Sequence, residues 1–284
     1  QVQFFRGILG RWMNHFSTRF LFFEGDWAHL NLSTPNAGVM LIADLVLLIY
    51  GVVALAKRKA GAAVLFLIYW IFVSPLPAAL SRDSVHAIRA LNLVIPMTVI
   101  LAFGATFLIE KVNELRGRFV VGKIFFTLLF CSLYFANFLY FLDQYFIHMN
   151  VHNAEHWQYG YKQLVEKVTP LQNNYSQIII PQSYAQPYIY FLFYKKYDPL
   201  TYQKEVKTIF GPAGPLDAKL VAKIDNINFE FIDWHKDSGR KGSLVIGDTV
   251  QIPPGDSSDE SRFKLIGEIK NLNDKTLFRL VEIL

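Results

Sequence analysis

Long apolar runs separated by short polar loops fill the first half of the chain. The runs are close to the roughly 20 residues that a helix needs to cross the hydrocarbon core of a bilayer. The third run contains Pro96, which predicts a kink in that helix. The pattern therefore predicts a membrane all-α bundle of about four transmembrane helices, at residues 38–56, 61–73, 91–109 and 119–142.

The segment before the first run, Phe4–Phe23, is apolar and aromatic but contains Arg6, Arg11 and Arg19. Burying an arginine near the bilayer centre costs about 2.5–3.5 kcal/mol on insertion scales, which opposes a spanning helix here. Aromatic bulk combined with arginines is typical of a helix that lies in the interface plane. We therefore expect an interfacial helix beside the bundle.

The pattern changes after residue 144, where polar and apolar residues mix. Helical periodicity and short β-type runs follow one another here, which favours a small soluble α/β domain with a mixed sheet. We divide the chain into a transmembrane region, residues 1–144, and an α/β domain, residues 145–284. The expected helices are Glu155–Val168 and Gln186–Tyr194, and the expected strands are Ser176–Pro181, Ile227–Ile232, Ser243–Ile246, Arg262–Ile269 and Thr276–Ile283.

Composition indicates a membrane protein with a soluble part. Of the 284 residues, 52% are hydrophobic, more than in an ordinary soluble chain, and 18% are charged, more than in an all-membrane chain. The net charge is +5, and the basic residues stand beside the apolar runs, so we expect no nucleic-acid partner. The one cysteine, Cys131, excludes an intrachain disulfide and a cysteine-based metal site.

Basic residues near the ends of the runs predict the orientation. Seven of them follow the first and third runs on one side, against five on the other side, including the N-terminal arginines. By the positive-inside rule, the loop at 81–89 and the α/β domain face outward. We therefore expect a multi-pass plasma-membrane protein with an extracytoplasmic C-terminal domain. The seven residues are Lys57, Arg58, Lys59, Lys111, Arg116, Arg118 and Lys123.

The loop Ser74–Arg89, SPLPAALSRDSVHAIR, joins the second and third runs at the membrane surface. If it winds into a helix after Pro77, Arg82, His86 and Arg89 lie on one face, at spacings of four and three residues. A cationic face at the headgroup level would bind the phosphate of a lipid-linked substrate. The same residues would also serve as interfacial anchors, and spacing alone leaves both interpretations open.

A second polar loop, Glu24–Asn36, precedes the first run and contains Glu24, Asp26 and His29. These three side chains could contact an acceptor substrate or order the loop, or they are plain solvated loop residues. No residue is assigned as a metal ligand. The α/β domain has neither a Gly-rich phosphate loop nor a nucleophile elbow, so the sequence assigns no catalytic residue there.

Four blocks of the chain resemble a known family. They are similar to the C-terminal part of bacterial multi-spanning glycosyltransferases of the GT-C class, which resemble the dolichyl-phosphate-mannose protein mannosyltransferases and the aminoarabinose transferase of lipid A. The most specific match is PAALSRDSVHAIR, where Pro77, Leu80, Asp83, His86 and Arg89 fit the family pattern. The blocks are Phe16–Asp26, Pro35–Gly38, Trp70–Pro96 and Tyr188–Gln203.

The resemblance implies an active site on the outer face of the membrane lipid bilayer and a polyprenyl-phosphate sugar as donor. It implies transfer of that sugar to a glycan, lipid or protein acceptor of the cell envelope, with His86, Arg89 and Arg82 as donor phosphate-binding residues. The family's catalytic acid lies in the first outer loop of the full enzyme, so we expect this chain to be a C-terminal fragment without it. A divalent metal stays open as a cofactor.

A second class of function also fits the sequence, namely a membrane-anchored extracytoplasmic binding or assembly module without catalysis. A transporter fragment fits less well, because transport sites use paired ionisable residues at mid-membrane and the runs offer only Asp44, near an end. Further spans and an acidic outer loop encoded upstream would favour the transferase. A signal sequence directly before Gln1 would favour the anchored module.

Overall fold

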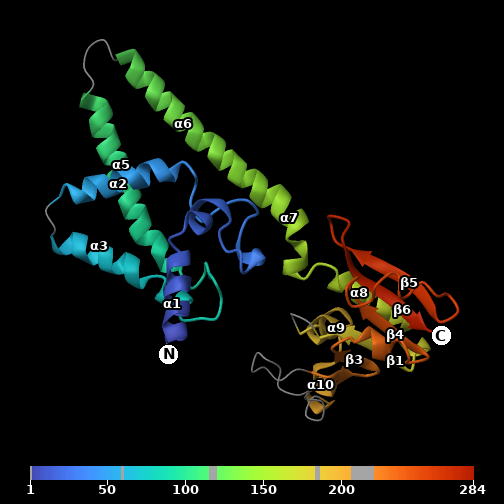
Figure 1. Ribbon diagram of the computed structural model, residues 1–284. Helices are drawn as coiled ribbons and strands as arrows, with labels where there is room; N and C mark the ends of the chain where they lie inside the picture. The colour runs from blue at the N-terminus through green and yellow to red at the C-terminus, as the bar shows by residue number, and fades with distance from the viewer. Residues whose placement is uncertain (1, 59–60, 115–119, 183–185, 206–220) are drawn as a thin grey trace. The chain divides into compact units, whose positions relative to one another are not determined.

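The computed structural model shows two compact units, Gln1–His156 and Trp157–Leu284, and each is described by itself (Figure 1). The first unit consists of helices and irregular loops. The second contains the six strands of the described residues and the helices that pack on them. The structure describes residues 2–58, 61–114, 120–182, 186–205 and 221–284.

Three helical stretches of the first unit are long and apolar enough to cross a membrane. They agree with the second, third and fourth predicted runs. They are Ala62–Ala79, with α3 (Ala62–Val73) and α4 (Leu76–Ala79); Leu91–Glu114, with η3 (Leu91–Leu93) and α5 (Val94–Glu114); and Val121–His152, with α6 (Val120–Asp143), η5 (Gln144–His148) and α7 (Met149–His152).

The expected first transmembrane helix is wrong in length. The described helix here, α2 (Asp44–Ala56), has 13 residues, or about 20 Å at 1.5 Å per residue, against a hydrocarbon core of about 30 Å. The run is shortened because its first residues bind another segment. The backbone N–H groups of Val39 and Met40 donate to the carbonyls of Phe20 (3.2 Å) and Leu21 (2.8 Å). The described residues thus hold three candidate spans and one short apolar helix.

The N-terminal segment is divided, where a single interfacial helix was expected. Helix α1 (Val2–Asn14) has no buried residue, and its Trp12 indole donates to the carbonyl of Phe72 at 2.9 Å. After a turn, the π-helix η1 (Arg19–Phe23) buries three apolar side chains, Phe20, Leu21 and Phe22, within the unit. The prediction that α1 lies flat in the interface stays a prediction.

Helices α2 and α5 are in close backbone contact. Gly104 of α5 faces the carbonyl of Leu47 in α2 so closely that a Cβ atom at Gly104 would overlap that oxygen. Small residues at crossing points are the usual way in which helices approach in a lipid environment. Pro96 lies in the first turn of α5, where a helix N–H has no intrahelical partner to lose, so the predicted kink within this span is not needed.

The second unit contains a six-stranded mixed sheet in the order β2-β3-β1-β4-β6-β5 (Figure 1). Strand β1 is parallel to both neighbours, β3 and β4, and the other pairs are antiparallel. The predicted mixed sheet is confirmed, and the short β2 was not predicted. The strands are β1 (Gln177–Pro181), β2 (Lys223–Ile224), β3 (Ile227–Glu230), β4 (Ser243–Gly247), β5 (Phe263–Lys270) and β6 (Thr276–Ile283).

Both faces of the sheet are buried. Ile178 and Ile180 of β1 pack with α8 and α9 on one face, while Ile179 packs with Trp234 and Ile252 on the other, as the alternation along a strand requires. The helices of this unit and its entry are η6 (Ala154–Trp157), α8 (Tyr161–Val168), η7 (Thr169–Asn174), α9 (Tyr188–Tyr194), α10 (Pro199–Glu205) and α11 (Trp234–Asp237).

Candidate functional site

Five polar side chains from two loops of the first unit gather in one place. One loop follows η1 and the other follows α4. In the described part of the chain, Asp26, His29 and His86 form the only group of three or more His, Cys, Asp or Glu side chains whose ligand atoms all lie within 4.8 Å of one another. Asp83 and Arg89 adjoin them. We call these five residues the Asp26 cluster.

Asp26 connects the two loops. Its side chain is 0% exposed, its Oδ1 accepts the backbone N–H of His29 at 3.0 Å, and its Oδ2 accepts the backbone N–H of Ala87 at 2.7 Å. Its own N–H donates to Ser33 Oγ at 3.1 Å. Gly25 directly before it has φ +62°, which favours glycine. Asp26 is therefore not a solvated loop residue. Its hydrogen bonds order the loop, which was one of the roles that the sequence left open.

His29 and Asp83 continue the cluster toward solvent. His29 Nδ1 lies 3.1 Å from Asp26 Oδ1, and His29 Nε2 lies 3.7 Å from Asp83 Oδ1. The rings of His29 and His86 are in contact, with centroids 4.6 Å apart. The other oxygen of Asp83 accepts from the Arg89 guanidinium at 3.0 Å. The sequence prediction treated His29 and Arg89 as members of separate loops, and the structure brings them together.

A buried histidine outside the predicted site supports the loop. His15 is 0% exposed, its Nδ1 lies 2.9 Å from the carbonyl of Arg11, and its Nε2 accepts the backbone N–H of His86 at 3.2 Å. Burial lowers the pKa of His15, which favours the neutral ring with its proton on Nδ1. The sequence carries no signal for this role, because the contact joins segments 71 residues apart.

The predicted helical face over Arg82, His86 and Arg89 is wrong. Helix α4 ends at Ala79, and residues 81–90 form bends and turns because the polar groups there bind neighbouring loops. A turn brings Arg89 N to within 3.5 Å of His86 Nδ1. Arg82 is exposed and, within the described ranges, makes no hydrogen bond or ion pair. His86 and Arg89 therefore share a site, and Arg82 stands apart from it.

Burial and nearby cations act together on His86. Desolvation is the main cause that lowers the pKa of His86, and the charges of Arg89 and His29 add to it. The carboxylates of Asp26 and Asp83 oppose this effect more weakly. The imidazole is thereby biased toward its neutral form.

Glu24 does not belong to the cluster. It is exposed and paired with Arg19, whose guanidinium lies 4.3 Å from the ring centroid of Trp27. Exposed pairs of this kind add little stability. Of the three acceptor candidates in this loop, the structure places Asp26 and His29 at the site and Glu24 outside it.

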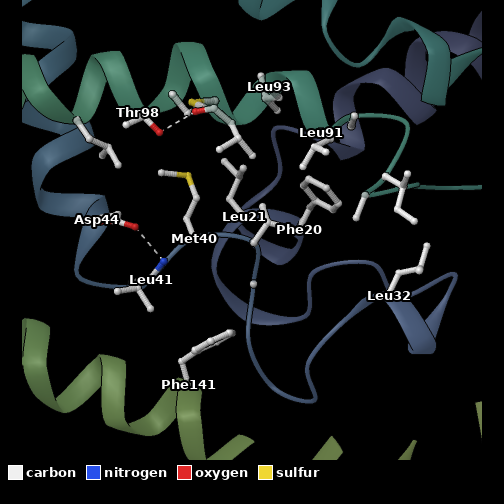
Figure 2. Close-up of a pocket in the computed structure, with 18 of the residues that line it drawn as sticks. Phe20, Leu21, Leu32, Met40, Leu41, Asp44, Leu91, Leu93, Thr98 and Phe141 are labelled. Carbon is white, nitrogen blue, oxygen red and sulfur yellow. Dashed lines mark hydrogen bonds between the residues drawn. The ribbon is translucent and has the colours of Figure 1, made fainter. Parts of the chain in front are cut away.

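An apolar cavity of about 600 Å³ borders the turn Ala87–Ala90, whose Arg89 belongs to the Asp26 cluster. It is lined by Ala87, Ile88 and Ala90 of the turn, and by residues of α5, α6 and the loop that precedes α2. Figure 2 shows Leu21 and Met40 between Leu93 of η3, directly before α5, and Phe141 of α6. Ala87 thus lines the cavity while its N–H binds Asp26.

Among the described residues, Asp44 is the only acid that lines the cavity, and its carboxylate is hydrogen-bonded to its neighbours. Asp44 at the start of α2 accepts the backbone N–H of Leu41 at 2.9 Å and the hydroxyl of Tyr134 in α6. Its carboxylate therefore fastens the helix start to α6. Because the carboxylate is already hydrogen-bonded, the lining of the cavity is largely apolar and fits a hydrocarbon chain.

No family model, curated protein or solved structure matches this chain. The resemblance to GT-C glycosyltransferases remains an expectation from the sequence, and the arguments below stand on the geometry of the first unit.

Proposed function

We propose that the chain is the donor-binding part of an integral membrane glycosyltransferase that moves a sugar from a polyprenyl phosphate to an extracytoplasmic acceptor. The observation that carries the proposal is the sharing of one turn, Ala87–Ala90, by an apolar cavity and the polar Asp26 cluster. A lipid-linked phosphate needs such a pair of surfaces, because its chain is apolar and its head is charged.

The cavity suits the first part of a lipid chain. Its volume of about 600 Å³ falls within the roughly 300–1,000 Å³ of sites that hold ligands of drug size. A long polyprenyl chain exceeds that volume, so only the units next to the phosphate would lie inside. The remainder would leave between the helices into lipid.

The cluster suits the head group. Arg89 uses one guanidinium nitrogen for Asp83 and is half exposed, and among the described residues its other guanidinium donors have no partner, so they can bind phosphate oxygens. His86 lies beside it. A base for the acceptor and a cation for the leaving phosphate are the groups that glycosyl transfer from a phosphate requires.

Binding of a short-chain polyprenyl phosphate to the detergent-solubilised chain tests the proposal. Val94 lines the cavity and is 51% exposed, whereas its neighbour Ile95 does not line it and is 50% exposed. Val94→Trp should fill the cavity and weaken binding at least about tenfold, or 1.4 kcal/mol, while the matched Ile95→Trp should change it less than about twofold. Native mass spectrometry can count the bound lipid.

The proposal fails if the probe binds equally to both tryptophan variants, or if the unmodified chain does not bind it. Thermal unfolding of both variants should match that of the unmodified chain. Comparable melting shows that a loss of binding in Val94→Trp reflects the filled cavity.

The expected orientation has a separate test. The segment Pro253–Gly255 lies in a turn of the second unit, and Pro254 and Gly255 are exposed. A protease site placed there should be cut in intact cells if the second unit is extracytoplasmic. Cleavage only after lysis would reverse the topology and remove the proposed outer active site.

A further inference from the structure

We propose that Asp26, His29 and His86 bind a divalent transition-metal ion of the Zn²⁺ type, with one coordination position left open. The ion binding stands on the contacts of the cluster. The role of the ion toward a donor phosphate rests on the proposed function.

The donor set favours such an ion. Two imidazoles and one carboxylate are the ligands of many catalytic zinc sites, which keep a further position for water or substrate. Imidazole selects zinc and its transition-metal neighbours over Mg²⁺ and Ca²⁺, which prefer oxygen ligands. Asp83 supplies a second carboxylate, with its Oδ1 3.7 Å from His29 Nε2.

The geometry needs only side-chain movement. Ligands at about 2.0–2.1 Å from a tetrahedral ion lie about 3.3–3.4 Å apart, and the three ligand atoms now lie within 4.8 Å of one another. His29 and His86 are partly exposed, so their rings can rotate toward a common centre. Asp26 is held by the backbone N–H groups of His29 and Ala87, which fix its carboxylate in advance.

The supporting contacts are those of a metal site. Backbone hydrogen bonds to a ligating carboxylate, and partners that orient a ligating histidine, tune such sites. Here the backbone N–H of His86 donates to His15 Nε2 at 3.2 Å. This hydrogen bond fixes the backbone that carries the His86 imidazole. The short contact between His29 Nδ1 and Asp26 Oδ1, at 3.1 Å, is the one that an ion would replace.

Charge gives an independent reason. Asp26 and Asp83 place two carboxylates beside the single guanidinium of Arg89. A bound divalent ion adds positive charge next to these carboxylates, and its open position can accept a phosphate oxygen. The ion therefore strengthens the attraction that Arg89 exerts on the proposed head group.

The test uses Co²⁺ as a spectroscopic probe on the detergent-solubilised full chain, without lipid. The chain is stripped of metal with EDTA and titrated with Co²⁺, and the visible absorption of bound Co²⁺ is recorded. Zn²⁺ is then added, and the loss of this absorption measures how Zn²⁺ displaces Co²⁺. We expect one ion per chain. His29→Gln and His86→Gln should each weaken binding by more than about 100-fold, because each removes a ligand.

A second histidine pair serves as the matched control. His148 and His152 stack at 5.5 Å between ring centroids, and His148 approaches Asp143 at 3.4 Å, so they could bind an ion adventitiously. Replacing both with Gln should leave the Co²⁺ spectrum unchanged. A spectrum that survives His29→Gln or His86→Gln, that disappears with the helix pair, or that never forms would overturn the proposal.

Two measurements keep this inference separate from the proposed function. In the first outcome, the chain binds polyprenyl phosphate in EDTA, Val94→Trp blocks this binding, and no Co²⁺ spectrum forms; the metal proposal is then rejected and the donor site is kept. In the second outcome, a Co²⁺ spectrum forms and depends on His86, but no lipid binds under any condition; the metal proposal is then kept and the donor site is rejected. Thermal unfolding of each variant verifies that it is folded.

Discussion

Each unit contains a carboxylate that gathers side chains from distant segments, and the two are built differently. Asp225 in the second unit accepts hydrogen bonds from Lys195 at 3.1 Å, Tyr197 at 2.9 Å and Gln172 at 3.3 Å. Asp26 in the first unit accepts from two backbone N–H groups and approaches His29. Asp225 thus has a lysine as its partner, whereas no lysine or arginine contacts Asp26 among the described residues.

The two carboxylates also differ in burial and in the way that their charge is balanced. Asp225 joins the turn between β2 and β3 to the C-terminal end of α9 and to η7. Its negative charge is balanced by the adjacent Lys195 ammonium, as in a structural ion pair. Asp26 is more deeply buried, accepts two backbone N–H groups, and adjoins two imidazoles; one of its donors, Ala87, lines the cavity. A buried acid with this set of neighbours is the usual composition of a binding site.

The largest effect should come from removing Asp26. Asp26→Ala leaves the N–H groups of His29 and Ala87 without their acceptor, and each buried unsatisfied group costs about 1–3 kcal/mol. We expect a loss of about 2–5 kcal/mol in the free energy of unfolding. Asp225→Ala should cost about 1 kcal/mol, because its partners can turn to water. Thermal unfolding in detergent compares them, and an equal or reversed order contradicts the comparison.

Arg89 should matter for transfer more than for stability. In the full-length enzyme, Arg89→Ala should lower sugar transfer about 30–100-fold, which is about 2–3 kcal/mol, by removing a charge-assisted contact to the leaving phosphate. Arg89→Lys should recover part of the rate, since an ammonium cannot bind phosphate bidentately. Lys195→Ala is the matched control, because Lys195 is the cation of the other cluster.

Initial rates with a polyprenyl-phosphate sugar measure this effect. In the absence of a divalent ion, His86→Ala should lower the rate less than Arg89→Ala does. Native transfer by a well-expressed Arg89→Ala protein would make the loop an interfacial anchor, the interpretation that the sequence left open.

The sheet could be predicted because its information is local. Ile178, Ile179 and Ile180 form an apolar run that is buried on both faces of a central parallel strand, as such runs usually are. The two-residue strand β2 could not be predicted, since it forms only by pairing with β3. The shortness of α2 was also hidden, because it depends on backbone hydrogen bonds to Phe20 and Leu21.

The site was predicted only in part because its contacts are not local. His86 and Arg89 were predicted to bind phosphate from their spacing together with the resemblance, although the helix that the spacing assumed does not form. The role of Asp26 stayed open between acceptor contact, loop ordering and a plain solvated residue, since its partner Ala87 is 61 residues away. His15 carries no chemical motif, and only the folded chain places its ring against the backbone of His86.

Acid should affect the Asp225 network in a defined direction. Burial acts to raise the pKa of Asp225, but hydrogen bonds from Lys195, Tyr197 and Gln172 outweigh it and lower the pKa. A carboxyl with a lowered pKa stabilises the fold above its unfolded pKa of about 3.9, and this contribution is lost as the pH falls through the folded pKa. Asp225→Asn should therefore cost about 1 kcal/mol at neutral pH and progressively less below about pH 4.

Hydrogen exchange of the β1 and β3 amides, followed by mass spectrometry, reports this local stability. A deficit in Asp225→Asn that persists at acid pH would show that the hydrogen bonds of this side chain do not depend on its charge. The interpretation of Asp225 as the acid of a structural ion pair would then be wrong.

The smallest effect should come from Arg82. This residue shares the loop with Arg89, but it is exposed and makes no hydrogen bond or ion pair with any described residue. Its charge lies in water and is screened over about 8–10 Å at physiological salt. Arg82→Ala should thus change donor binding less than about twofold and the free energy of unfolding less than about 0.5 kcal/mol. A loss as large as that of Arg89→Ala, measured by polyprenyl phosphate binding, would mean that the whole basic loop, and not the Asp26 cluster, recognises the head group.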